Sequence, residues 1–169
     1  MTMMSSAEQA LYDALNGLAV KWSVHEHAAV FTVEESAQLH RDIAGWHTKN
    51  LFLKDAGGQF WLVTAPHDAR VDLKALPAVI GAKKLSFGKA EDMERLIGIT
   101  PGSVTPLAAV NDIARAVHVV IDARLASADI VNVHPLRNSA TMSLAGADLI
   151  TFLTYIGHAP QIVVLPTPG

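Results

Sequence analysis

Two apolar runs joined by a tight turn constrain the fold of this chain more than any other feature of its sequence. The runs extend from Lys49 to Lys54 and from Gln59 to Ala65, and Asp55-Ala56-Gly57-Gly58 lies between them. Aspartate and glycine are typical of a β-hairpin turn, because they tolerate the backbone angles that a tight reversal needs. The sequence therefore predicts a pair of antiparallel strands.

Short helices and short strands follow one another around this hairpin without a regular order. Capping boxes at Ser6 and Thr32 predict the starts of two helices. Further helices are expected at 72–80, 91–97 and 148–156, and further strands at 22–27, 85–87, 117–122, 130–134, around 141 and at 161–165. Regular βαβ alternation, which is typical of a parallel sheet, is absent. The pattern predicts a mixed α/β (α+β) fold in which helices surround a partly closed mixed sheet.

The size of the chain fits one domain, so we expect residues 1–169 to fold as a single unit. The chain has no cysteine, which excludes disulfides, thiolate metal sites and cysteine nucleophiles. No apolar run approaches the ~20 residues needed to cross a bilayer, and the N-terminus does not resemble a secretory signal. We therefore expect a cytoplasmic protein that has no membrane partner.

Eight histidines raise the question of a metal site. His25 and His27 would share one face of a strand, but no His-x-x-x-His pair occurs and no nearby carboxylate completes a ligand set. The sequence also lacks Gly-x-Ser-x-Gly, Walker-type and Gly-x-Gly-x-x-Gly motifs, which argues against the usual serine hydrolases and nucleotide-binding loops. We expect neither a metal nor a cofactor.

Three polar features remain as candidates for chemistry. Lys49 opens an apolar strand, so its stem can pack while its ammonium reaches a cleft. The segment from Thr100 to Pro106 is rigid, and its backbone N–H groups could be fixed donors to a carbonyl oxygen. A dense polar cluster at 134–141 lies between two apolar strands. Taken separately, these features also fit a solvated lysine, an ordinary turn and a set of capping residues.

The basic residues are unevenly distributed along the chain. From Lys49 to Lys89 there are seven basic and three acidic residues, a local charge of +4, although the whole chain carries −3. Such a region can bind phosphates at one face, or it can be a solvated surface.

Taken together and in their order, these features resemble the YbaK-like and prolyl-tRNA-synthetase-insertion (INS) editing domains, and most closely the free-standing branch called ProXp-ala. The resemblance covers about His27 to Ile162 and is carried by Val30 to Ser36, Thr48 to Asp55, Val71 to Leu76, Leu85 to Phe87, Pro101 to Pro106, Asn111-Asp112, and His134-Pro135 with Asn138 and Thr141. It implies a YbaK-like mixed β-barrel-like sheet flanked by helices.

The resemblance also implies a function, the hydrolysis of mischarged tRNA in trans, with alanine wrongly attached to proline tRNA as the substrate. A synthetase pocket shaped for proline disfavours alanine by only about 1–3 kcal/mol, so a second, smaller pocket is needed to remove the error. The implied catalytic elements are Lys49 and a Gly-x-x-x-Pro loop, here Gly102, Ser103, Val104, Thr105 and Pro106. We expect the loop to stabilise charge on the carbonyl oxygen, and Lys49 to hold the terminal phosphate or ribose or to act as a base.

Other residues are expected to bind the substrate. Candidates for shaping the small pocket are Thr32, His134, Asn138 and Thr141, and candidates for tRNA contacts are Arg70, Lys74, Lys83 and Lys84. The four pocket candidates could equally cap helices or turns.

Alternative functions remain open from the sequence. The protein could deacylate another misacylated tRNA, such as one carrying cysteine or serine, or it could be a catalytically silent tRNA-binding module. It could also act alone, or docked to prolyl-tRNA synthetase or an elongation factor. The presence of both Lys49 and the Gly102–Pro106 loop favours an enzyme.

Overall fold

The predicted hairpin forms the centre of the fold in the computed structural model, which describes residues 6–29 and 33–168. Strand β2 (Trp46–Asp55) pairs antiparallel with β3 (Phe60–Pro66) along nearly its whole length. Asp55 fixes the turn, because its carboxylate accepts hydrogen bonds from two backbone N–H groups of the turn, each at 2.9 Å.

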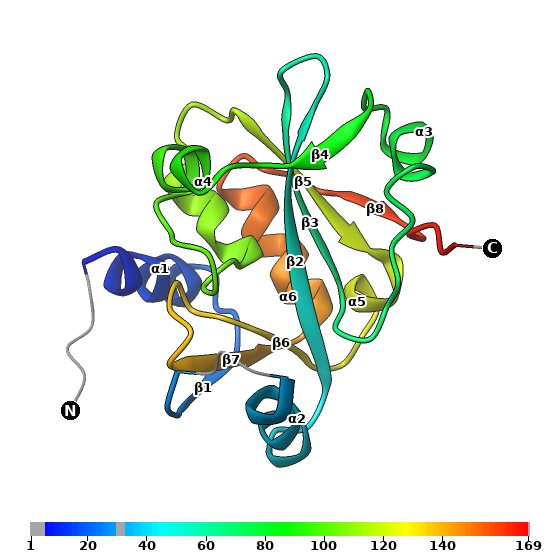
Figure 1. The fold of residues 1–169 in the computed structure, drawn as a ribbon. Helices are drawn as coiled ribbons and strands as arrows, with labels where there is room; N and C mark the ends of the chain where they lie inside the picture. Colours follow the sequence, from blue (N-terminus) through cyan, green and yellow to red (C-terminus); the bar gives the residue numbers. More distant parts are fainter. Residues whose placement is uncertain (1–5, 30–32, 169) are drawn as a thin grey trace.

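Strand β2 joins two parts of one mixed sheet. The strand order is β1-β7-β6-β2-β3-β5-β8, and β4 pairs with the far end of β2. The other strands are β1 (Trp22–Glu26), β4 (Leu85–Phe87), β5 (Val117–Asp122), β6 (Val131–Val133), β7 (Ala140–Leu144) and β8 (Gln161–Val163). In Figure 1, β1, β7 and β6 run across the bottom of the molecule while β2, β3 and β5 rise above them. This confirms the expected partly closed mixed sheet.

One edge of β2 changes partner along its length. Trp46 and His47 pair with β6, whereas the pairing with β4 begins only at Leu53. Between them, from Thr48 to Leu51, this edge of β2 has no partner strand among the residues that the structure describes. The backbone there is open on one side.

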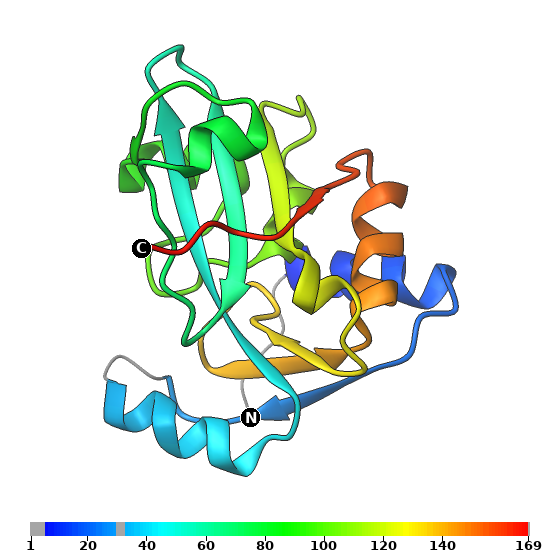
Figure 2. The ribbon, with the colours of Figure 1, turned by 90° about the vertical axis from the view of Figure 1, so that its right-hand side faces the viewer.

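Six α-helices and a 3-10 helix surround the described sheet. They are α1 (Ser6–Gly17), α2 (Val33–Asp42), α3 (Leu76–Ile80), α4 (Ala90–Ile97), α5 (Ala123–Ala126), α6 (Gly146–Tyr155) and η1 (Pro106–Asn111). The largest core cluster joins side chains of α1, η1 and α6 to those of the strands, and Phe152 of α6 is fully buried in it. Figure 2 shows α2 apart from this core, at the lower edge of the molecule beside the start of β2. Within the described residues, no helix combines the length and the apolar character that crossing a membrane requires.

The expected elements are confirmed with small shifts at their ends. The helix expected from residue 72 begins at Leu76, because Asp72 instead closes a turn by accepting a hydrogen bond from the Lys74 N–H at 3.0 Å. Helix α2 extends from Val33 to Asp42. The predicted cap of this helix, Thr32, lies outside the described residues.

A buried ion pair attaches α1 to the sheet. The carboxylate of Glu8, which is only 2% exposed, accepts hydrogen bonds from the Arg137 guanidinium at 2.9 Å and from the Tyr12 hydroxyl at 2.5 Å. Arg137 lies between β6 and β7 and also donates two hydrogen bonds to Glu26 of β1, at 2.6 and 2.8 Å. Burial and the hydrogen bond with Glu8 raise the pKa of Tyr12, so its hydroxyl remains a donor. The network holds α1, β1 and the β6–β7 loop together.

Replacing Glu8 should therefore destabilise the protein. Glu8→Ala leaves the Tyr12 hydroxyl and part of the Arg137 guanidinium without their acceptor, and we expect it to lower the free energy of unfolding by about 1–3 kcal/mol. Urea denaturation measures this change. Glu94→Ala, at an exposed position of α4, is the control and should change stability by less than about 0.5 kcal/mol. Equal stabilities of the two variants would show that the buried pair contributes nothing.

Candidate active site

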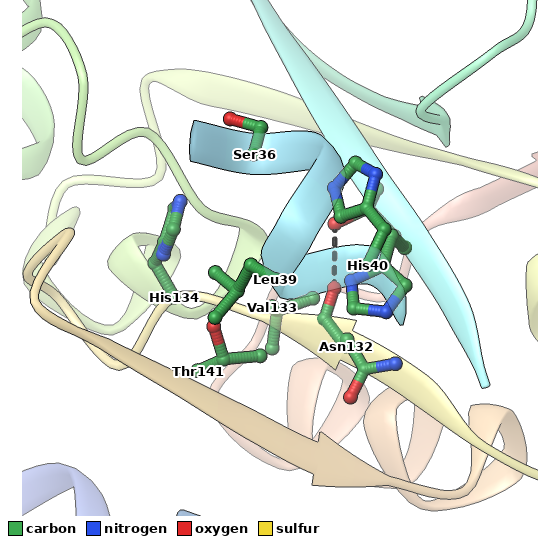
Figure 3. A pocket seen from close by; sticks show the side chains of 9 residues that line it. Ser36, Leu39, His40, Asn132, Val133, His134 and Thr141 are labelled. Carbon is green, nitrogen blue, oxygen red and sulfur yellow. Dashed lines mark hydrogen bonds between the residues drawn. The ribbon is translucent and has the colours of Figure 1, made fainter. Parts of the chain in front are cut away.

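A small pocket opens where α2 meets β2, β6 and β7 (Figure 3). Its volume is about 90 Å³, well below the ~300–1,000 Å³ of sites for larger ligands. The lining residues are Ser36, Leu39, His40, His47, Thr48, Asn132, Val133, His134 and Thr141. In Figure 3 the side chains of α2 face those of β6 and β7 across the pocket.

Hydrogen bonds fix the floor of this pocket. The Thr48 hydroxyl donates to the Asn132 carbonyl at 2.7 Å, which ties β2 to β6. The Asn132 side chain donates to the Ala44 carbonyl at 3.0 Å and accepts a hydrogen bond from the Ser143 hydroxyl at 2.5 Å. Since Asn132 is only 2% exposed, these bonds are shielded from water and keep the floor rigid.

Two of the predicted substrate-binding residues, His134 and Thr141, line the pocket. Nδ1 of His134 is 3.1 Å from the Ala140 carbonyl oxygen, so Nδ1 carries the proton of the neutral ring and Nε2 is an acceptor. Burial lowers the pKa of His134, which keeps the ring neutral near pH 7. The Thr141 hydroxyl is 2.9 Å from Nε2 of His27, which follows β1. The pocket thus combines a neutral imidazole and an oriented hydroxyl with apolar side chains.

The Gly-x-x-x-Pro loop adjoins the pocket through β2. Nδ2 of Asn50 donates to the Val104 carbonyl at 3.0 Å, and the Thr64 hydroxyl donates to Oδ1 of Asn50 at 2.6 Å. Side chains two residues apart lie on the same face of a strand. Asn50 and the pocket residue Thr48 therefore share one face of β2, and the loop is held on that face.

The rest of the loop is fixed at both ends. Gly102 has a φ of +95°, which favours glycine. A β-carbon at this position would lie 3.8 Å from Nδ2 of Asn138, so Asn138 neighbours the loop rather than lining the pocket. At the other end, Thr105 and Pro106 are buried, and the Thr105 hydroxyl accepts a hydrogen bond from the Leu107 N–H at 3.3 Å. Ser103 is tied back to Thr100 by a 3.1 Å backbone hydrogen bond.

Lys49 adjoins these residues in sequence, but its ammonium lies on the other face of β2. Its Nζ donates to the Ala69 carbonyl, in the segment after β3. Neighbouring side chains of a strand point to opposite faces, so Lys49 and Asn50 diverge. The structure therefore does not bring the Lys49 ammonium opposite the Gly102–Pro106 loop, and the role of Lys49 stays a prediction.

The four predicted tRNA contacts are exposed and lie outside the pocket. Arg70 and Lys74 are between β3 and α3, and Lys83 and Lys84 are between α3 and β4. In Figure 1 this part of the chain climbs from the lower end of β3 to the top of the molecule. These basic residues are thus distributed along this segment of the chain rather than gathered at the pocket.

A cluster of three histidine rings beside the pocket was not predicted. The ring centroid of His40 is 4.2 Å from that of His47 and 4.1 Å from that of His67. Nε2 of His47 is 2.7 Å from the Ile43 carbonyl oxygen at the end of α2. Burial, with smaller contributions from the other two rings, lowers the pKa of His40 to about 4, and burial lowers that of His47. Across residues 6–29 and 33–168, no group of three or more His, Cys, Asp or Glu side chains is arranged to hold a metal ion.

Similarity to known proteins agrees with this geometry. Residues 27–152 match the profile of a family described as the aminoacyl-tRNA editing domain. The chain is 38% identical over 164 residues to the prolyl-tRNA editing protein ProX of Acetoanaerobium sticklandii. The alignment covers 96% of this chain and 100% of that protein. It is also 37% identical over 166 residues to prolyl-tRNA synthetase associated domain-containing protein 1 of Bos taurus. This alignment covers 95% of this chain and 97% of that protein.

A solved structure has the same fold. It is a crystal structure described as a candidate trans-editing enzyme for prolyl-tRNA synthetase, and it superposes with a TM-score of 0.73 over 99% of this chain and 100% of that chain, at 21% identity. The family indicated by the sequence motifs is confirmed: this chain belongs to the aminoacyl-tRNA editing domain family.

Proposed function

We propose that this protein acts in trans to hydrolyse alanine from mischarged proline tRNA. Its family membership gives the class of activity, an aminoacyl-tRNA deacylase. One observation carries the choice of amino acid: the pocket beside the Gly102–Pro106 loop has a volume of only about 90 Å³. The name of the ProX relative, a prolyl-tRNA editing protein, supports the choice of tRNA.

The pocket walls suit the side chain and amino group of alanine. Leu39 and Val133 supply apolar surface for a methyl group, and Nε2 of His134 and the Thr141 hydroxyl supply polar partners for the α-amino group. The larger proline ring would collide with these walls, which stand on a hydrogen-bonded floor. Exclusion by size is the second step of a double sieve.

Hydrolysis requires a water to attack the ester carbonyl and the ester bond to the ribose to break, releasing alanine and the ribose hydroxyl. Within the described residues, the N–H groups of Val104 and Thr105 are not used by hydrogen bonds. They can donate to the carbonyl oxygen as it gains negative charge. The Asn50 contact keeps this loop in place, so the donors are already oriented before the substrate binds.

Lys49 is assigned to the phosphate or ribose of the terminal nucleotide. Its ammonium is bound to the Ala69 carbonyl, but the edge of β2 is open from Thr48 to Leu51. The flexible stem can therefore turn round this edge when a phosphate offers a stronger, charged acceptor. In this role Lys49 positions the substrate, and the reaction needs no protein nucleophile.

A panel of mischarged tRNAs tests the proposed substrate. We expect the wild-type protein to deacylate Ala-tRNA(Pro) faster than tRNA carrying serine or cysteine. A faster reaction with one of the latter would assign the pocket to that amino acid. Binding without turnover of any substrate in a time course would identify a silent tRNA-binding module.

Removing the Lys49 ammonium should abolish most of the activity. We expect Lys49→Ala to lower kcat/KM for Ala-tRNA(Pro) by about 100-fold, the order of the loss caused by misplacing a substrate. Lys54→Ala, an exposed position of the same strand, controls for the general loss of positive charge. Full activity in folded Lys49→Ala would remove this residue from the mechanism.

Enlarging the pocket should weaken its selectivity. Leu39→Ala removes part of the apolar wall, and we expect the ratio of prolyl to alanyl hydrolysis to rise by about tenfold. Leu96→Ala, a half-buried position of α4, makes the same truncation away from the pocket. If Leu39→Ala discriminates as strictly as the wild type, the pocket does not select by size.

The histidine cluster predicts acid sensitivity. The folded pKa of His40, about 4, lies below its ordinary value of 6.5, so the docking of α2 is fully stable above pH 6.5 and weakens as the pH falls toward 4. Since α2 supplies a wall of the pocket, we expect KM to rise in this window. His40→Phe keeps an aromatic ring that cannot be protonated. The KM of this variant should therefore rise less than that of the wild type as the pH falls. Identical profiles of KM against pH for the two proteins would contradict this role of His40.

A further inference from the structure

A second hollow lies next to the active-site pocket. It has a volume of about 310 Å³ and is lined by Gly45, Trp46, His47, His67 and Asp68. His47 lines both hollows. The His40 ring, which lines the first pocket, packs at a tilt against the rings of His47 and His67. The histidine cluster therefore forms the partition between the two hollows.

Trp46 provides a fixed aromatic surface for the second hollow. Its side chain is 42% exposed, which is unusual for the largest apolar residue. The backbone before it is held close to Ile130: Trp46 N–H donates to the Ile130 carbonyl at 3.0 Å, and a β-carbon at Gly45 would lie 2.5 Å from the Ile130 side chain. An exposed ring on a rigid backbone suits stacking of a nucleic-acid base.

The polar groups of this hollow suit a base better than a phosphate. The exposed carboxylate of Asp68 would repel a phosphate, but it can accept a hydrogen bond from an exocyclic amine. His47, whose pKa is lowered by burial, contributes no positive charge near pH 7. A flat heteroaromatic ring that carries an amino group meets both conditions.

Basic residues follow this hollow along the chain. Arg70 follows Asp68 by two residues, and Lys74, Lys83 and Lys84 follow along the chain as it climbs the molecule (Figure 1). Strand β2, ten residues long, spans roughly 30 Å at ~3.3 Å per residue. The basic series thus extends well beyond a single nucleotide and offers sites for successive phosphates.

We propose that the second hollow binds the adenine base of the 3′-terminal nucleotide of tRNA, with Trp46 stacked on its face and Asp68 accepting its amino group. This inference rests on the proposed deacylase function. The aminoacyl ester occupies the small pocket, the ribose lies over the histidine partition, and the base enters the second hollow. Trp46 and Asp68 hold the nucleotide and do not take part in the bond-breaking step.

Variants of Trp46 test the stacking contact. Loss of one base–aromatic stack typically costs about 1–3 kcal/mol, so we expect Trp46→Ala to raise KM for Ala-tRNA(Pro) by roughly 5- to 150-fold, with a smaller effect on kcat. Trp46→Phe keeps an aromatic face, so its KM should stay within a few-fold of the wild-type value. Tyr155→Ala, which removes an exposed aromatic ring from α6, is the matched control and should leave KM unchanged. A KM for Trp46→Ala equal to that of the control would overturn the proposal.

A change in the substrate tests the contact with Asp68. A tRNA that ends in purine riboside lacks only the amino group of the terminal adenosine. We expect the wild type to have a higher KM for this substrate than for the unmodified tRNA. Asp68→Ala should not raise the KM for this substrate any further. Independent, additive effects of the two changes would exclude the contact.

The deacylase function and the base-binding site can be tested separately. If the wild type deacylates none of the mischarged tRNAs, the proposed function is wrong. If it deacylates one of them and Trp46→Ala keeps the wild-type KM, the function stands and the base-binding site is wrong. A different preferred amino acid leaves this test valid, because every such substrate ends in the same adenosine.

Discussion

The site depends on strand β2, which pairs with two different strands along one edge and carries residues of the site on both faces. The edge of β2 pairs with β6 at its start and with β4 at its end, and its backbone is open between them. Alternation along this strand places Thr48 and Asn50 on the face of the pocket and the loop, and Lys49 on the opposite face, while His47 at the start of the strand lines both hollows. A shift of one residue in register would exchange these sets. The hairpin register, fixed by the Asp55 turn, therefore decides which side chains meet the substrate.

Local rules predicted the elements, but not the faces on which the site residues lie. The hairpin follows from Asp55, Gly57 and Gly58, since each acts within the turn itself. The contact of Asn50 with Val104 joins residues 54 positions apart, and the histidine cluster joins α2, β2 and the segment after β3. Motif order correctly identified the family. It could not show that Lys49 binds the Ala69 carbonyl, because the chain after β3 had to be placed first.

The Gly102–Pro106 loop and the pocket are held largely by residues outside the family motifs. Thr64 orients Asn50, which holds Val104, and Arg137 ties the loop between β6 and β7 to Glu8 on α1. These bonds lie in buried or half-buried surroundings, where an unmade hydrogen bond is costly. The framework therefore favours one arrangement of the loop and the pocket floor. A rigid small pocket is what exclusion by size requires, since a wall that yields by the width of a methylene would admit proline.

The low pKa values of His40 and His47, between the two hollows, also have a physical reason. A cationic histidine at this position would attract the phosphates of tRNA into the space assigned to the base, and it would repel the α-amino group of the substrate whenever that group is protonated. Burial of His40 and His47 prevents both effects by lowering their pKa values. Positive charge is instead placed outside, on Arg70 and the lysines beyond it, whose side chains are exposed to solvent. In the proposed arrangement, this separation of charge from the buried histidines orders the nucleotide: phosphates outside, base on Trp46, and ester beside the loop.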